Sequence, residues 1–109
     1  MSLIDLPFPN SIKSVSAATT SGAGTALAGR MGADISFQVI ETATVSAGVV
    51  NLEGSLDGAT WATLATWTHG TDASGAIKSV TTPVAYVRAN VASITVSDAG
   101  AVDVWVCVG

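Results

Sequence analysis

The sequence predicts an all-β chain folded as an antiparallel β-sandwich or a small barrel. Apolar and polar residues alternate with a period of two over several short segments, and glycine-containing turns separate those segments. Alanine is abundant, yet no segment keeps the apolar spacing of a helix through four turns. About eight such segments in a chain of this length are typical of a single sandwich domain.

Four segments alternate most clearly and are predicted to be strands with one buried face. They are residues 34–42, 49–53, 86–91 and 101–108. The last is the clearest, because four valines share one face and Trp105 lies on the other. In the second and third segments, the same alternation predicts that Glu53 and Arg88 point outward.

Four weaker strands complete the prediction. They are expected at residues 12–18, 24–29, 60–67 and 76–82, with the alternation interrupted by alanine and threonine. Turn-forming pairs separate the strands, among them Asp57-Gly58, Ser74-Gly75 and Ala99-Gly100. Together these segments predict one domain over residues 12–109.

Residues 1–11 differ from the rest and are predicted to form an extended N-terminal arm. The arm carries four apolar side chains that are interleaved with Pro7 and Pro9, which remove backbone donors and hold the chain extended. The four are Leu3, Ile4, Leu6 and Phe8. An apolar arm of this kind either folds over its own domain or docks on a neighbouring subunit, and the low charge of the chain favours docking.

The composition excludes several classes of function. Charged residues make up 11% of the chain, the net charge is −4, and the four cations are scattered. Without a basic cluster, no nucleic acid is expected as a partner. No membrane partner is expected either, since no apolar run is long enough to span a bilayer. Cys107, the single cysteine, cannot form an intrachain disulfide. The N-terminus lacks a signal-peptide pattern, which predicts a protein made in the cytoplasm.

Candidate catalytic and metal-binding residues are sparse. His69 and Asp72 could be written into a Ser-His-Asp triad, but their segment is more simply a polar loop. A weak calcium site from loop aspartates Asp57, Asp72 or Asp98 is the one metal alternative. Glu41 and Glu53 are predicted to be solvated residues on separate strands. We therefore expect no catalytic residues, no cofactor and no enzyme activity.

The tryptophans are more informative. Trp61 follows the Asp57-Gly58 turn and is predicted to pack between the sheets. Trp105 lies opposite the valine face, so it is covered by another part of the chain or forms an interface with a partner. On outward faces of late strands, Arg88 and Asp103 are predicted to pair.

One stretch of the chain resembles a known group of proteins. Residues 52–64 form a strand, a tight turn and a strand that opens on tryptophan, and Tyr86-Val87-Arg88 follows downstream. This S-x-D-G-x-x-W-x-x-L … Y-V-R pattern is similar to that of small bacteriophage structural proteins with a jelly-roll β-sandwich, such as capsid decoration (cement) proteins. It also resembles discoidin-type jelly rolls that bind sugars or lipids, although the chain lacks their cysteine pair and their aromatic-rich loop.

The resemblance covers about residues 34–108 and implies a jelly-roll-like sandwich in a virion. It implies a decoration protein that bridges and stabilises major capsid subunits, assembled in the host cytoplasm and present as a homotrimer. The expected interface residues are Leu3, Ile4, Leu6, Phe8 and Trp105. The alternative is a phage tail module or a carbohydrate- or receptor-binding module.

Overall fold

The structure is a computed structural model that describes residues 10–29, 34–42 and 44–109. These ranges contain strands and no helix, so they hold no helix able to cross a membrane. The strands are β1 (Asn10–Ala18), β2 (Gly22–Ala23), β3 (Leu27–Ala28), β4 (Ile35–Glu41), β5 (Val45–Ser55), β6 (Ala62–Thr68), β7 (Ile77–Val80), β8 (Tyr86–Val96) and β9 (Val102–Val108). The all-β prediction is confirmed. The weak strand expected at 24–29 is replaced by the two short strands β2 and β3.

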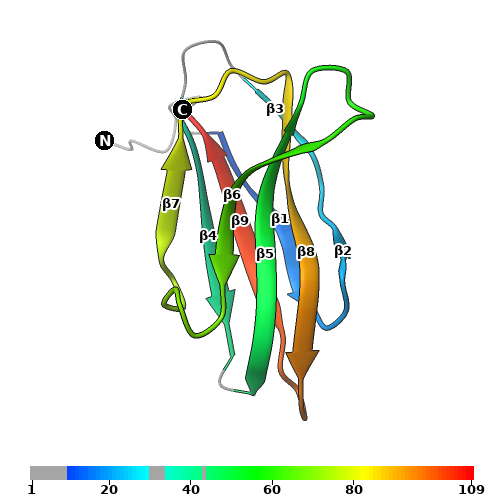
Figure 1. The fold of residues 1–109 in the computed structure, drawn as a ribbon, viewed down its shortest axis with the longest axis vertical. Helices are drawn as coiled ribbons and strands as arrows, with labels where there is room; N and C mark the ends of the chain where they lie inside the picture. The colour runs from blue at the N-terminus through cyan, green and yellow to red at the C-terminus, as the bar shows by residue number, and fades with distance from the viewer. Residues whose placement is uncertain (1–9, 30–33, 43) are drawn as a thin grey trace, which may run out of the picture.

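The strands form two antiparallel sheets that lie face to face (Figure 1). Sheet A has the order β1-β9-β4-β7, and sheet B has the order β2-β8-β5-β6, with β3 also paired to β8. If β2 and β3 count together as the second of eight strands, the first strand pairs with the last, the second with the seventh, and so on inward. These are the pairs of one long hairpin rolled into two sheets, so the predicted sandwich is jelly-roll-like.

The core lies between the sheets and consists mainly of valine. The inward residues of β4, β8 and β9 alternate with outward ones as predicted, and the four valines of β9 are almost completely buried. Trp67 on β6 is the largest buried side chain and is 1% exposed. Because β-branched residues suit a pleated, half-buried surface, their alternation accounts for most of the inner face on these three strands.

The strand ends define two ends of the sandwich, called upper and lower here after their positions in Figure 1. Strand β1 starts at the upper end, where Asn10 pairs with Val108 and where Ile35 pairs with both Val108 and Val80. The segments that join β5 to β6 and β7 to β8 also lie at the upper end. Residues 10 and 11, assigned to the arm from sequence, belong to β1.

One edge of the sandwich is closed by Ser14. In the pairing of β1 with β9, Ser14 is an extra residue between Lys13 and Val15, and this bulge turns its side chain inward. The Ser14 hydroxyl donates to the carbonyl of Thr25 at 2.8 Å and accepts the backbone N–H of Ala89 at 3.1 Å. A single side chain thus connects the edge of sheet A to sheet B.

The opposite edge is spanned by Lys78 on β7. Its Nζ donates to the carbonyl of Thr66 on β6 at 2.8 Å and lies 3.1 Å from Oδ1 of Asp72. The edges of the two sheets are therefore held together by different chemistry, a buried hydroxyl at β1 and a half-exposed ammonium at β7.

A second bulge overturns the prediction for Trp61. Leu52 pairs with Ala65 but Glu53 pairs with Thr63, so Leu64 is an extra residue in β6. One extra residue shifts the side chains that precede it to the other face of the sheet. Trp61 consequently lies on the outer face of sheet B, and the tryptophan between the sheets is Trp67.

Candidate interaction surface

Trp105 lies near the centre of the outer face of sheet A. It projects from β9, an inner strand of the sheet, and its cross-strand partners are Lys13 on β1 and Gln38 on β4. The side chain lies outside the core, as predicted, and the residue is 38% exposed. An exposed tryptophan at the middle of a sheet presents a large apolar area to a partner.

Apart from Lys13 and Asp103, the residues around Trp105 are apolar or uncharged, and together they are called the Trp105 face here. Ile77 on β7 is 65% exposed, and Ile40 on β4 is also exposed. A hollow of about 110 Å³ lies between the strands of this face. The side chains that line it on the outer side are Ser11, Ser36, Gln38, Ile77, Trp105 and Cys107. This set offers contact area and a few hydrogen bonds, but no acid–base pair.

Two charged residues border Trp105, and their contact with each other is long. The Nζ atom of Lys13 lies 5.4 Å from the centroid of the Trp105 ring and 3.9 Å from Oδ2 of Asp103. The Oδ1 atom of Asp103 accepts the backbone N–H of Ala17 at 2.7 Å. The predicted pairing of Asp103 with Arg88 is wrong, because β8 and β9 belong to different sheets.

The other predicted interface residues, Leu3, Ile4, Leu6 and Phe8, lie outside the described residues. In the sequence they immediately precede β1, and the first residue of β1 lies at the upper end of the edge of sheet A.

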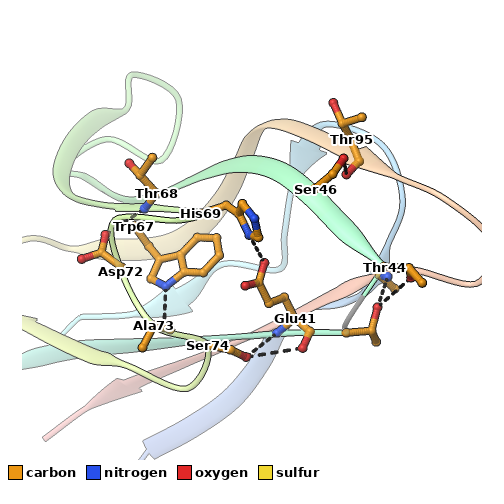
Figure 2. Close-up of polar contacts among 12 residues, drawn as sticks. Glu41, Thr44, Ser46, Trp67, Thr68, His69, Asp72, Ala73, Ser74 and Thr95 are labelled. Atoms are coloured by element: carbon orange, nitrogen blue, oxygen red, sulfur yellow. Dashed lines mark hydrogen bonds and ion pairs between the residues drawn. The ribbon is translucent and has the colours of Figure 1, made fainter.

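A polar cluster lies at the lower end, where the β6–β7 loop meets the end of β4 (Figure 2). The Nδ1 atom of His69 lies 2.7 Å from Oε2 of Glu41, whose side chain is 13% exposed. Beside them, the indole N–H of Trp67 donates to the carbonyl of Ala73 at 3.0 Å, and the rings of Trp67 and His69 meet edge to face. Glu41 is therefore paired, and the prediction that it is simply solvated is wrong.

The cluster does not assemble a catalytic triad. Asp72 accepts the backbone N–H of Thr68 at 2.8 Å and pairs with Lys78, so its carboxylate holds the loop instead of orienting His69. The Ser74 hydroxyl is bonded to the backbone of Glu41. Backbone donation by Thr68, followed by Lys78, lowers the pKa of Asp72. These contacts fix the loop, as the sequence predicted, and they engage the carboxylate of Asp72 and the hydroxyl of Ser74 elsewhere than at His69.

The loop aspartates do not converge on a cation. Asp57 lies in the β5–β6 loop at the upper end, whereas Asp72 and Asp98 lie in loops at the lower end. The backbone N–H groups of Thr60 and Ala59 and the hydroxyl of Ser55 hold the pKa of Asp57 well below its usual range. Within the described ranges, no group of three or more potential ligands could hold a metal ion.

The outer face of sheet B carries a second tryptophan in a different setting, called the Arg88 stack here. Its members are Glu53, Trp61, Arg88 and Asn90. The guanidinium of Arg88 lies 4.0 Å from the centroid of the Trp61 ring, and its Nε donates to Glu53 at 2.9 Å. The amide of Asn90 donates to the other carboxylate oxygen at 3.1 Å. Glu53 is 9% exposed, so the prediction of a solvated carboxylate is wrong here too.

Sequence reasoning missed Ile77 and Cys107 as members of the Trp105 face. Their sequence segments carry the alternation, but the alternation does not reveal that β7, β4 and β9 are neighbours. The residues come together only through the non-local order of the strands. A period-of-two pattern contains no information about that order.

No protein-family model matches the chain, and no curated protein matches it. Among solved structures, the SPBc2 prophage-derived protein YomS is similar to it, with a TM-score of 0.71 and 9% sequence identity. The alignment covers 95% of this chain and 96% of that one. At this identity the similarity shows that the two chains share a fold.

Proposed function

We propose that this chain is a non-enzymatic structural protein of a bacteriophage particle, a capsid decoration protein that bridges major capsid subunits as a homotrimer. The observation that carries the proposal is the Trp105 face, a surface with an exposed tryptophan, two exposed isoleucines and few charges. Burial of such a face against a neighbouring subunit removes apolar area from water. The shared fold with a prophage-derived protein supports the phage origin.

In this proposal the contact residues are Trp105 and the apolar side chains Leu3, Ile4, Leu6 and Phe8. The work of the protein is mechanical, because each copy adds buried area between subunits and thereby strengthens the shell. The location is the capsid surface, after assembly in the host cytoplasm.

A carbohydrate-binding or receptor-binding module, on a tail or elsewhere, is the alternative. Sugar-binding sites commonly stack a sugar on an exposed aromatic ring, and on sheet B the candidate ring is that of Trp61. Arg88 already occupies one face of that ring. The Arg88 stack therefore favours an internal structural role and does not favour the alternative.

Particles assembled with variant chains test the proposal. Copies of the chain per particle are counted by quantitative mass spectrometry after purification of full heads. We expect Trp105→Ala to lower occupancy severalfold and Tyr86→Ala to leave it unchanged. Tyr86 is a suitable control because it is an exposed aromatic residue on the other sheet, with similar exposure.

Three outcomes would overturn the proposal. They are equal occupancy for Trp105→Ala and wild type, recovery of the chain in tails and not in heads, and specific glycan binding by the purified chain.

A further inference from the structure

The upper end of the sandwich contains an apolar groove that the proposed function does not use. It has a volume of about 400 Å³, and its lining comes from the β5–β6 loop, the adjoining ends of these strands and the segment that joins β7 to β8. Its apolar walls come from Leu56, Leu64, Pro83 and Val84. Leu56 is 77% exposed, the most exposed large apolar side chain among the described residues. A volume of this size accommodates several apolar side chains.

The segment that precedes β1 has the composition to fill this groove. Residues 1–9 contain Leu3, Ile4, Leu6 and Phe8 and a single charged side chain, Asp5. The groove is likewise poor in charge, with Asp57 the one ionisable side chain in its lining. Two surfaces with so little charge meet at a small desolvation cost, and burial of their apolar groups is favourable.

The segment also leaves the domain at the end where the groove lies. Asn10 pairs with Val108 at the upper end of sheet A, and β7 ends at Val80 in the same row of the sheet. The chain that follows β7 forms one wall of the groove. Fully extended, residues 1–9 span about 30 Å.

The short reach of Phe8, the one aromatic side chain of the segment, favours a second copy over the same chain. Strand β1 and strand β7 form opposite edges of sheet A, three strand spacings or about 14 Å apart. Phe8 lies two residues before Asn10 and reaches about 7 Å at most, so it falls short of the groove of its own chain. Pro7 and Pro9 restrict the turning that a return path would require.

We propose that residues 1–9 of one copy dock in the upper groove of a second copy of this chain. Each copy then donates one segment and receives another, which is a heterologous contact that closes into a ring. The contact supplies the self-association that the proposed function assumes. In this arrangement residues 1–9 serve the contact between copies, and the Trp105 face carries the contact with the capsid. Because the two contacts use different surfaces of the domain, each can fail without the other.

Matched charge substitutions in the full chain test the docking. Leu6→Asp alters the segment, Leu56→Asp alters the groove, and Ala99→Asp adds the same charge at an exposed turn of the lower end. Oligomeric state is measured by analytical ultracentrifugation over a range of concentrations, and circular dichroism confirms that each variant folds. We expect wild type and Ala99→Asp to form the same oligomer. Leu6→Asp and Leu56→Asp should each weaken association by about 10- to 100-fold, the loss expected for one leucine no longer buried.

Mixing the two interface variants gives a sharper test. The Leu6→Asp chain retains an intact groove and the Leu56→Asp chain retains an intact segment, so a mixture can form one good contact per pair. We expect a 1:1 heterodimer from two variants that are monomeric alone.

Three results would overturn the proposal. The first is a wild-type chain that is monomeric at all concentrations. The second is a mixture that remains monomeric, which would indicate docking within one chain. The third is dissociation by Ile77→Asp together with an unaffected Leu56→Asp oligomer, which would assign self-association to the Trp105 face.

Discussion

The outer faces of the two sheets each carry a tryptophan beside a cationic side chain. The two faces differ in how close the cation lies to the ring and to its carboxylate partner. On sheet B, the guanidinium of Arg88 lies 4.0 Å from the Trp61 ring and 2.9 Å from Glu53. On sheet A, the ammonium of Lys13 lies 5.4 Å from the Trp105 ring and 3.9 Å from Asp103. The side chains of the first ion pair are 24% and 12% exposed, whereas those of the second are 37% and 36% exposed.

On sheet B, the charged and aromatic side chains are paired with one another. On sheet A, the tryptophan ring has no close partner of this kind among the described residues. Arginine has a planar group that stacks on a ring while its Nε binds a carboxylate, so Arg88, Glu53 and Trp61 complete one another. Lysine is a hydrated point charge on a flexible stem, and it covers little of the ring of Trp105. The apolar area of Trp105 therefore remains available to another molecule.

The largest effect is expected from breaking the Arg88 stack. Arg88→Ala leaves the nearly buried carboxylate of Glu53 with Asn90 as its remaining side-chain partner and uncovers the Trp61 ring. Loss of one member of a buried ion pair is strongly destabilising, and because this pair is half-buried we expect a loss of about 2 to 3 kcal/mol in the free energy of unfolding. Urea unfolding followed by far-ultraviolet circular dichroism measures it. A loss below about 1 kcal/mol would show that the stack contributes no more than an exposed pair.

The corresponding substitution on sheet A is expected to have a much smaller effect. Lys13→Ala removes an exposed ion pair and a distant cation–π contact, so we expect the unfolding free energy to fall by less than about 1 kcal/mol. The same urea experiment provides the comparison. Equal losses of unfolding free energy for the Lys13 and Arg88 variants would mean that the two cation–tryptophan pairs contribute equally to stability.

The smallest effect concerns the β5–β6 loop, which carries Trp61 of the Arg88 stack. Asp57 has a lowered pKa in the folded chain against an ordinary value of 3.8, so its ionised form stabilises the fold above pH 4. That contribution decreases as the pH falls below 3.8 toward the lowered pKa. We expect Asp57→Asn to lower the urea midpoint at pH 7 and to lower it less at pH 2.5. An equal difference at the two pH values would exclude ionisation of Asp57 as the cause.

The strands were predictable because alternation is a local property of the chain. Ile35, Phe37 and Val39 on β4 and the valines of β9 are buried as the pattern requires. Where the prediction failed, a bulge intervened. The extra residue Leu64 in β6 reverses the alternation, and no local signal distinguishes it from the neighbouring alanines and threonines.

The candidate surface was predictable only in part. The pattern on β9 placed Trp105 outside the core, because its neighbours in sequence are the buried valines. Its companions Ile77 and Gln38 come from strands that are distant in sequence, and their contact depends on the order β9-β4-β7. The prediction that Arg88 pairs with Asp103 was wrong for the same reason, since the partner of Arg88 is Glu53 on β5.

The contact between Lys78 and the carbonyl of Thr66 has a consequence for aggregation. Strand β6 is an edge strand of sheet B, and its outer backbone groups would otherwise be available to a strand from another molecule. Lys78 binds one of those carbonyls and places a charge beside the edge. Uncontrolled strand addition at this edge is thereby opposed, while the two surfaces proposed for assembly, the Trp105 face and the upper end, lie elsewhere on the domain.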